Sequence, residues 1–427
     1  MRAHLLLLML CVGAMASGVR QLWNISSSSG ICSTADFYDG LAFFGTNGGK
    51  LYAVDAKSGA VRWTYAGGTL NDSPLVAGTK VVIGDSTGPL RCFDAATGKL
   101  LWAFTQSQGF WGCKAAFGRV NGVDAVFIGG DSMNVYAVSL DNGTALWSTS
   151  IGAGADTSDA LFYDASNFVI GDQNGVLTSL NANTGGVNWK VQVRSGAIYK
   201  GTLWNGKVFI GGACVSTDGK LLWKIADLTN SVGAPAVIGS TVVWPSNDGT
   251  VHASDVSGKV LWSVILGGQQ LDGSATAYDG LALVGGHHGL YAIDPSTGKT
   301  SWSIQASGYA SQLSSPAVRH GVVYFGTTLA EDSYMFAYSI GRATIAESIC
   351  DDNHCSLNCR TGKVEIGCVR VSNSSSVDRV VVARTLSVRH YYESDVCGGG
   401  PYSDSTYAEG ACSILPTGGS FRWSASS

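Results

Sequence analysis

The sequence predicts an all-β protein, in which an eight-bladed β-propeller closed by its N-terminal strand precedes a small disulfide-rich β module at the C-terminus. Three observations support this fold class. The 427 residues include 57 glycines, 12 tryptophans and 16 tyrosines, which is typical of many strands joined by tight turns. A glycine and a tryptophan recur together at intervals of about 40 residues. Six of the 11 cysteines lie in the last 78 residues.

Residues 1–16 are predicted to be a secretory signal peptide. A short basic region and an apolar run, MRAHLLLLML, precede the small-residue site Ala14-Met15-Ala16. Lipid attachment at Cys11 is the alternative, but Leu10 stands where a small residue is expected before a lipidated cysteine. We therefore expect an exported chain.

The repeat is defined by a glycine that precedes a tryptophan by four residues, as in DPSTGKTSW at 294 and DAATGKLLW at 94. Asp or Asn bonds its own backbone and glycine supplies a positive φ, so we expect a turn before each tryptophan strand. The tryptophans follow one another at steps of 39, 45, 42, 34, 39 and 40 residues, which fits a four-stranded propeller blade. They are Trp63, Trp102, Trp147, Trp189, Trp223, Trp262 and Trp302.

Each repeat unit also contains a hairpin ahead of this turn. An apolar run leads to a glycine, a short Gly/Asn/Asp turn follows, and an LYAID-like strand comes next. The glycines that end the apolar runs are Gly45, Gly84, Gly129, Gly171, Gly211, Gly285 and Gly326, and VVWPS at 242 takes their place in the remaining unit. Eight hairpins are therefore expected, although only seven Gly-to-Trp strands follow them.

Trp23 accounts for the missing strand. It lies 40 residues before Trp63 in VRQLWNIS, and no hairpin precedes it. We expect this strand to complete the last unit, so that N-terminal and C-terminal strands close the ring over residues 19–340 and leave no open sheet edge. The repeat tryptophans should pack between neighbouring blades.

The LYA-x-D and TG-x-x-x-W pattern over residues 19–340 resembles the PQQ-like repeat of eight-bladed propellers. That superfamily includes quinoprotein alcohol dehydrogenases, a bacterial outer-membrane assembly lipoprotein and luminal stress-sensor domains. The resemblance implies the fold and leaves the activity open, because enzymes and scaffolds share it. WD-type propellers fit less well, since no repeat tryptophan is followed by aspartate. We favour the non-enzymatic branch, which resembles the assembly lipoprotein.

Quinoprotein enzymes, as the resemblance implies, place an adjacent Cys-Cys ring over PQQ and hold calcium with Glu, Asn and Asp beside a catalytic Asp. In this sequence Cys32, Cys92, Cys113 and Cys214 are well separated, and no two cysteines are adjacent. No calcium-binding set is identified either. The sequence therefore predicts no catalytic, cofactor-binding or metal-binding residue, and a PQQ- and calcium-dependent oxidoreductase remains the alternative.

Candidate ligand-binding residues lie in the connections between blades and in the turns between second and third strands, which should share one face at the channel mouth. Phe110 and Trp111 lie beyond the repeat Trp102 and are not explained by the repeat. Aromatic and polar residues together suit a peptide, a glycan or a small molecule, and packing of the channel neck is the alternative. The predicted ligand face is Phe110, Trp111, Asp156, Tyr199, Lys200, Asp272, His287, His288 and Tyr309.

His287 and His288 form the densest histidine group. Metal binding there would need partners from neighbouring loops, which the sequence does not identify, so an exposed polar turn is the simpler interpretation. The loops DQNG at 172 and SNDG at 246 faintly resemble calcium loops. Asn-Gly and Asp-Gly are also what a tight hairpin requires, and we favour that interpretation.

The C-terminal segment, residues 341–427, is predicted to be a separate β module because KVEIGCVRV and DRVVVARTLSV alternate as strands do. Its cysteines allow fifteen pairings, so the connectivity stays open, and zinc is disfavoured because CxxC pairs are missing. The cysteines predicted to form disulfides are Cys350, Cys355, Cys359, Cys368, Cys397 and Cys412. Possible N-glycosylation sites are Asn24, Asn71, Asn142 and Asn373.

Charge and hydropathy restrict the partners. The net charge is −4, with 27 basic against 31 acidic residues and no long basic block, which argues against nucleic acid. No stretch beyond the leader approaches a membrane span. We expect a secreted, non-enzymatic binding or scaffold propeller, located outside the cell or in the endolysosomal lumen, with a protein, peptide or glycan at its mouth. A carbohydrate-binding secreted protein is a further alternative.

Overall fold

The computed structural model describes residues 18–340, with short gaps, and five strands between residues 380 and 424. The gaps in the first range are residues 71, 107–108, 111–113, 131–132, 153–157, 227, 229–230, 232, 267–270, 272, 287, 307–311 and 329–332. The chain divides into two compact units, residues 1–340 and 341–427. The described residues contain no helix that is long and apolar enough to cross a membrane.

Seven four-stranded antiparallel sheets of consecutive strands form blades 1 to 7. Blade 1 is β2 (Asp36–Tyr38), β3 (Leu41–Gly45), β4 (Lys50–Asp55) and β5 (Val61–Ala66). Blade 2 is β6 (Leu75–Ala77), β7 (Lys80–Ile83), β8 (Leu90–Asp94) and β9 (Leu100–Phe104). Blade 3 is β10 (Ala116–Val120), β11 (Val123–Gly129), β12 (Asn134–Ser139) and β13 (Ala145–Ser150). Blade 4 is β14 (Leu161–Phe162), β15 (Asn167–Gly171), β16 (Val176–Asn181) and β17 (Val187–Gln192).

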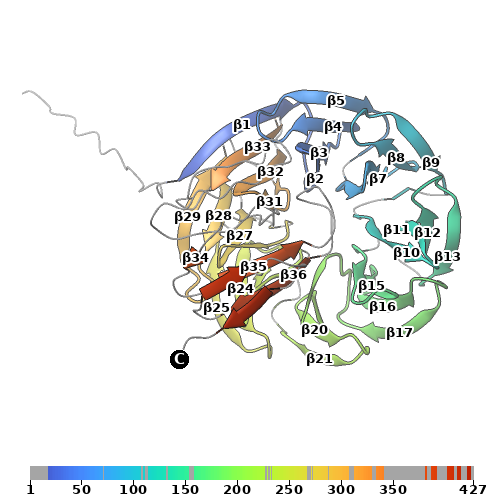
Figure 1. The fold of residues 1–427 in the computed structure, drawn as a ribbon. Coiled ribbons are helices and arrows are strands. Elements are labelled where there is room, and N and C mark those ends of the chain that lie inside the picture. The colour runs from blue at the N-terminus through green and yellow to red at the C-terminus, as the bar shows by residue number, and fades with distance from the viewer. Residues whose placement is uncertain are drawn as a thin grey trace, which may run out of the picture. The chain divides into compact units, whose positions relative to one another are not determined.

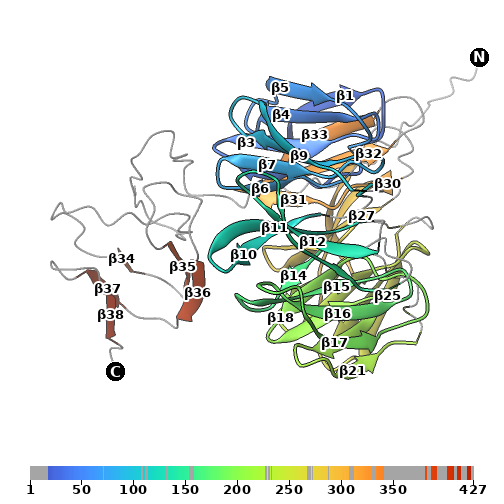
Figure 2. The ribbon, with the colours of Figure 1, turned by 90° about the vertical axis from the view of Figure 1, so that its right-hand side faces the viewer.

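The second half of the ring continues in the same order. Blade 5 is β18 (Gly201–Trp204), β19 (Lys207–Ile210), β20 (Ala213–Ser216) and β21 (Leu221–Lys224). Blade 6 is β22 (Ala236–Ile238), β23 (Thr241–Pro245), β24 (Thr250–Asp255) and β25 (Val260–Ile265). Blade 7 is β26 (Thr276–Tyr278), β27 (Leu281–Gly286), β28 (Gly289–Ile293) and β29 (Thr300–Gln305). Figure 2 shows these blades from the side.

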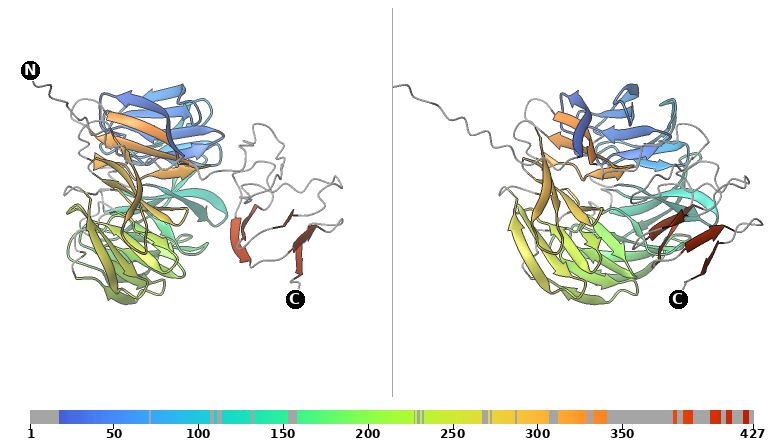
Figure 3. Two further views of the ribbon diagram at one scale, coloured as in Figure 1. Left: turned by 90° about the vertical axis from the view of Figure 1, so that its left-hand side faces the viewer. Right: turned by 60° about the vertical axis from the view of Figure 1, so that its left-hand side comes forward.

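Blade 8 joins the two ends of the propeller. It contains β30 (Gln312–Leu313), β31 (Ala317–Arg319), β32 (Val322–Thr328) and β33 (Ser333–Ile340), and its outer strand is β1 (Val19–Ser27). β1 runs antiparallel to β33 from Val19 opposite Ile340 to Ser27 opposite Ser333. Figures 1 and 3 show the blue N-terminal strand beside the orange strands of this blade. The predicted eight-bladed ring, closed by the N-terminal strand, is confirmed.

The repeat glycines and tryptophans touch across blades. The β-carbon of an alanine in place of Gly59 would lie 2.8 Å from the Trp23 ring, and one in place of Gly98 would lie 2.6 Å from the Trp63 ring. Trp63 Nε1 donates to the carbonyl of Ala95, 2.9 Å away, in the same turn. Each tryptophan thus packs on the turn of the following blade, where only glycine leaves room for the indole.

The same indole hydrogen bond recurs around the ring, with lengths of 2.8 to 3.2 Å. The donors are Trp23, Trp63, Trp102, Trp147, Trp189, Trp223 and Trp262. Within the described part of the chain, Trp302 makes no such bond. The next blade, blade 8, has no turn between its two outer strands to accept it, because β33 and β1 come from opposite ends of the propeller. The interblade position predicted for these rings is confirmed.

Replacing Gly98 by alanine should therefore destabilise the propeller by about 1 to 3 kcal/mol more than replacing Gly78 by alanine. Both glycines have positive φ, +73° and +58°, but no atom lies within 4 Å of a β-carbon at Gly78. The comparison separates contact with Trp63 from backbone strain, and urea unfolding of both variants measures it. Equal losses would mean that the Gly-to-Trp spacing reflects turn conformation alone.

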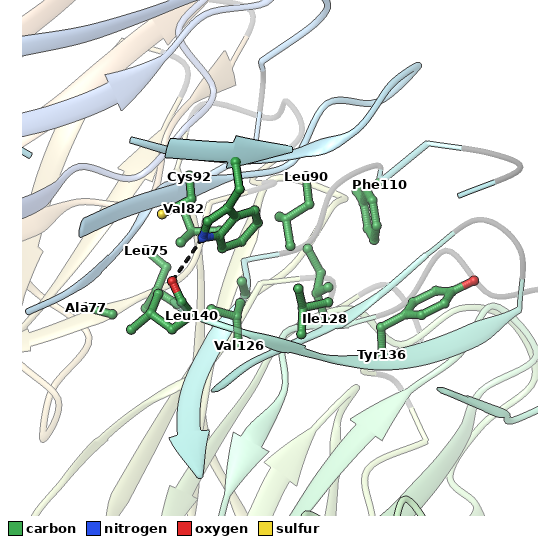
Figure 4. Packing of buried hydrophobic residues seen from close by; sticks show 13 residues of the cluster. Leu75, Ala77, Val82, Leu90, Cys92, Phe110, Val126, Ile128, Tyr136 and Leu140 are labelled. Atoms are coloured by element: carbon green, nitrogen blue, oxygen red, sulfur yellow. Dashed lines mark hydrogen bonds between the residues drawn. The ribbon is translucent and has the colours of Figure 1, made fainter. Parts of the chain in front are cut away.

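The core is a ring of apolar clusters between adjacent blades. Figure 4 shows the cluster shared by blades 2 and 3, in which Val82 and Cys92 face Val126 and Leu140. Burial raises the pKa of the Cys92 thiol to about 12 and that of the Cys214 thiol to about 11, despite nearby lysines. Both are buried free cysteines, so we expect them to act as small apolar residues.

The second unit contains five described strands. They are β34 (Val380–Val381), β35 (Leu386–Tyr391), β36 (Tyr402–Tyr407), β37 (Ala411–Ile414) and β38 (Phe421–Ser424). β34, β37 and β38 form one antiparallel sheet, and β35 pairs with β36. The predicted strand content is present in part of DRVVVARTLSV, whereas KVEIGCVRV lies outside the described residues. Of the six cysteines only Cys412, in β37, has a described backbone position, so the disulfides remain a prediction.

Candidate functional site at the channel mouth

One face of the propeller is formed by the connections between blades and by the turns between second and third strands. The two sets of loops contact each other: Phe110 N donates to Asp85 O at 2.9 Å, and Ile198 N donates to Asp172 O at 3.0 Å. This arrangement, which the strand order predicted, brings the described candidate residues, Phe110, Tyr199, Lys200 and His288, onto the same face. We refer to it as the mouth face.

Hydrogen bonds between neighbouring blades order the inner rim of the mouth face. In four pairs of neighbouring blades, the residue two positions before the first strand donates its backbone N–H to a side chain. The acceptor is the residue at the same position of the next blade. Thr34 N donates to Ser73 Oγ at 2.9 Å, and Ser274 N donates to Ser315 Oγ at 2.8 Å. Lys114 N donates to Asp159 Oδ1 at 2.8 Å in the same way. The rim is therefore a fixed frame.

Lys114 and Asp36 form an ion pair within this rim. Lys114 Nζ lies 3.1 Å from Asp36 Oδ2, and the two side chains are 32% and 27% exposed. Asp36 belongs to blade 1 and Lys114 precedes blade 3, so the pair spans blade 2, whose Val76 N also donates to Asp36 Oδ2. A partly exposed charge pair held in this way offers both signs of charge to a partner. Neither residue is among those predicted from the sequence to bind a ligand.

Phe110 is a correction to the predicted ligand face. Its side chain is fully buried, and its ring lies 6.2 Å from the rings of both Phe104 and Tyr136. Phe110 and Tyr136 lie at the same end of the cluster in Figure 4. The hydrophobic contact with blade 3 explains its position, so Phe110 packs the neck of the mouth and is not available to a ligand. Trp111 lies outside the described residues.

Asp85 and Arg91 fix the second-to-third-strand turn of blade 2. Arg91 Nη1 lies 2.6 Å from Asp85 Oδ2, and the Asp85 side chain is 2% exposed. Asp85 Oδ1 also accepts the N–H groups of Thr69 and Thr87, each at 3.0 Å. Burial raises the pKa of Asp85, but the N–H of Thr69 and the Arg91 guanidinium outweigh it and hold the pKa below its usual value.

Tyr199 and Lys200 are half-buried at the inner rim, where blade 5 begins. The Tyr199 carbonyl accepts the N–H of Asp159 at 3.1 Å, which continues the rim from blade 4. Arg194 lies in the same connection, and its guanidinium donates to the carbonyls of Ser231 and Ala197. Burial lowers the pKa of Arg194, and the neighbouring Tyr199 opposes this shift. Tyr199 therefore lies near a second basic residue, Arg194.

The remaining predicted residues are placed only in part. His288 is half-buried, and its carbonyl accepts Ala306 N at 2.9 Å. Asp156, Asp272, His287 and Tyr309 lie outside the described residues. Across the described ranges, no three His, Cys, Asp or Glu side chains come together as metal ligands.

Two of the predicted N-glycosylation sites lie among the described residues. The predicted glycosylation residues Asn24 and Asn142 are both exposed, Asn24 on β1 and Asn142 in the third-to-fourth-strand turn of blade 3. Asn142 Oδ1 accepts the N–H and hydroxyl of Thr144. Asn71 and Asn373 lie outside the described residues, and glycosylation itself remains a prediction.

Comparison with known proteins places this geometry in a family. A family model described as outer membrane protein assembly factor BamB matches residues 12–164, 135–211 and 212–397. The outer membrane protein assembly factor BamB of Yersinia pestis is 25% identical over 282 residues, which cover 59% of this chain and 70% of that protein. The dehydrogenase subunit of the quinone-dependent alcohol dehydrogenase of Gluconobacter oxydans is 34% identical over 97 residues, only 18% of this chain and 13% of that protein.

A solved structure supports the same fold. The crystal structure of BamB from Moraxella catarrhalis covers 74% of this chain and 99% of its own, with a TM-score of 0.62. Sequence identity in that superposition is 17%, so the likeness is one of fold. The matched share agrees with the extent of the propeller, residues 18–340.

Proposed function

The chain belongs to the family of the outer membrane protein assembly factor BamB, and from this membership we propose that it is a non-enzymatic propeller that binds a protein partner on its mouth face. The observation that carries the proposal is the inner rim, where hydrogen bonds connect the charged residues Asp36, Lys114 and Asp159 across blades 1 to 4. Charged side chains on a rigid frame suit specific recognition because little side-chain freedom is lost on binding.

The connections between blades support binding rather than catalysis. They run from six residues (306–311) to eleven residues (105–115), which leaves little chain to cover a cofactor. The sequence match to the quinone-dependent dehydrogenase subunit of Gluconobacter oxydans covers 18% of this chain. An enzymatic role would show itself by quinone absorbance and bound calcium in the native protein, and binding on a glycan array would favour the carbohydrate alternative.

Export is part of the same proposal. The relatives are named for assembly of outer membrane proteins, and the chain begins with the predicted signal peptide. We propose a location beyond the inner or secretory membrane, and the extracellular and endolysosomal locations remain predictions. Fractionation of cells that express the native chain tests this directly.

Reversing the charge of Lys200 should reduce the recovery of the partner. Wild-type and Lys200→Glu chains would be tagged, expressed in the native host and used to purify associated proteins, with recovery measured by quantitative mass spectrometry. A charge of the wrong sign, desolvated at the rim, should weaken binding of specific partners at least tenfold. This corresponds to a loss of about 1.4 kcal/mol or more of binding free energy. Tyr199→Ala should reduce the same partners.

Lys99→Glu is the matched control, since Lys99 is an exposed lysine in the third-to-fourth-strand turn of blade 2, away from the mouth face. It should leave recovery unchanged. Partners that are retained by Lys200→Glu and Tyr199→Ala alike, in chains that melt as wild type does, would rule out the mouth face as the binding site.

A further inference from the structure

The outer strands of blades 5 and 6 expose large apolar side chains. On β21, Leu221 is 38% exposed and Leu222 is 45% exposed. On β25, Val260 is 48% exposed, Leu261 is 45% exposed and Ile265 is 69% exposed. Each of these side chains leaves roughly half of its apolar area in water, although burial of that area would be favourable. The two strands therefore carry apolar surface that the propeller itself does not cover.

A β-bulge in each strand accounts for the exposure but not for the residue type. Leu222 in blade 5 and Leu261 in blade 6 are skipped in the pairing with the third strand, so they and the residues before them are all exposed. The skipped residue is Arg62 in blade 1, Asn188 in blade 4 and Ser301 in blade 7. The bulge therefore tolerates a polar residue, and the fold does not require leucine at this position.

The exposed pairs of the two strands lie beside each other. Trp223 Nε1 donates to the carbonyl of Val256 at 3.2 Å, and a β-carbon at Gly258 would lie 2.6 Å from the Trp223 ring. The pair that precedes Trp223 is thus next to the turn that leads into β25. Figure 1 shows β21 and β25 at the outside of neighbouring blades. We refer to residues 220–222 and 259–261 as the lysine-flanked edge.

Lysines border this apolar surface. Lys220 and Lys259 directly precede the two apolar pairs, and Lys224 ends β21. Neither β21 nor β25 contains an acidic residue. Asp218, which pairs with Lys220, and Asp255 lie in the turns before the strands, so three lysines stand against two aspartates. The lysine-flanked edge is therefore weakly positive on a chain whose net charge is −4.

We propose that the lysine-flanked edge binds the surface of an anionic lipid bilayer. Its four aliphatic side chains enter the boundary between headgroups and acyl chains, and the lysines reach the lipid phosphates. The outward backbone groups of the two strands stay at the level of the headgroups, where water and phosphate can bond them. This inference goes beyond the proposed function, because it concerns the outer edge of the ring and not the mouth face.

The side-chain types favour a bilayer over a protein as the occupant. Lysine is depleted at protein interfaces, and the hot spots of those interfaces are formed mainly by Trp, Tyr and Arg, with Leu and Val under-represented. Aliphatic residues flanked by lysines are instead typical of peripheral binding to anionic membranes. A second copy of the chain would bring two weakly positive edges together, which is unfavourable.

Vesicle flotation of the full-length chain tests the proposal. Blade 7 supplies the substitution, since it reads Lys-Thr-Ser-Trp at 299–302, where blades 5 and 6 read Lys-Leu-Leu-Trp and Lys-Val-Leu-Trp. Wild type should float with vesicles of phosphatidylglycerol and phosphatidylethanolamine, and a variant with Thr-Ser in both blades should bind at least about tenfold more weakly. Both chains should melt at the same temperature, because the replaced side chains are exposed. The replacements are Leu221→Thr, Leu222→Ser, Val260→Thr and Leu261→Ser.

Blade 2 gives the matched control. It reads Lys-Leu-Leu-Trp at 99–102, but the skipped residues of its two neighbours are Arg62 and the half-buried Leu146. A single exposed pair offers less apolar surface to a membrane, and binding strength scales with that surface. Leu100→Thr combined with Leu101→Ser should therefore change vesicle binding less than about twofold.

Lys224→Gln combined with Lys259→Gln measures the electrostatic part. This variant should lose several-fold in affinity for the anionic vesicles, because each lysine near the surface contributes to the attraction. Binding to vesicles of phosphatidylcholine alone should be weak and should not change with the substitutions. High salt should reduce wild-type binding to the level of this variant, since salt screens exposed charges.

The outcomes separate a membrane from other occupants. Equal flotation of wild type and the Thr-Ser variant, no flotation of wild type, or equal binding to anionic and neutral vesicles overturns the proposal. A wild-type dimer that becomes a monomer in the Thr-Ser variant, without vesicle binding, makes the edge an interface between copies of the chain instead. If the Thr-Ser variant melts at a lower temperature, the lysine variant decides. Lys200→Glu should leave flotation unchanged, so failure of the mouth face and failure of the lysine-flanked edge are distinguished.

Discussion

Deleting Arg20 to Ser26 from the full chain should lower the free energy of unfolding by at least about 3 to 5 kcal/mol, the usual cost of losing a buried tryptophan. Trp23 is 7% exposed, and its Nε1 donates to Ala56 O in blade 1 at 2.9 Å. The deletion also removes the strand that pairs with β33, so blade 8 would present an open edge. Urea unfolding followed by tryptophan fluorescence measures the loss.

Asn24→Ala is the control for this deletion, since Asn24 is an exposed residue of the same strand. It should unfold as wild type does, and the deleted chain should also aggregate more readily, which light scattering would detect. A deleted chain with wild-type stability would mean that the ring does not depend on closure by β1.

The fold could be predicted from the sequence because one contact sets the repeat. A tryptophan needs the glycine turn of the next blade, so both residue types are fixed at a constant spacing. Which residues of the fourth strands are buried could not be predicted in the same way. Opposite Ala53 and Val54 the pairing skips from Trp63 to Val61, a bulge that leaves both Val61 and Arg62 exposed. Simple alternation of inward and outward residues therefore fails just before each repeat tryptophan.

The candidate site was only partly predictable because side-chain direction in a connection depends on the neighbouring blades. Phe110 and Lys114 belong to one connection, yet the first is fully buried and the second forms an ion pair with blade 1. A signal for Lys114 did exist. It stands two residues before its blade, where Ser73, Ser274 and Ser315 stand in three other blades, and its charge departs from that serine pattern.

The ion pair of Asp85 and Arg91 leads to the second large effect. Replacing Asp85 by alanine should lower the free energy of unfolding by about 3 to 5 kcal/mol, because it leaves the Arg91 guanidinium, 13% exposed, without its carboxylate. It also frees the N–H groups of Thr69 and Thr87. Asp141→Ala, which breaks the ion pair between Lys80 and a solvent-exposed carboxylate, should have a much smaller effect on the free energy of unfolding.

The pH dependence of the same pair has a definite sign. The folded-state pKa of Asp85 lies below its unfolded value of 3.8, so its contribution to stability is present above that value and is lost as the pH falls through the folded-state pKa. The difference in unfolding free energy between wild type and Asp85→Ala should therefore be constant from pH 5 to pH 7 and should shrink below about pH 4. Urea unfolding of both chains at a series of pH values measures it. A difference that grew on acidification would mean that Asp85 is protonated in the folded chain, and the turn of blade 2 would then depend on hydrogen bonds alone.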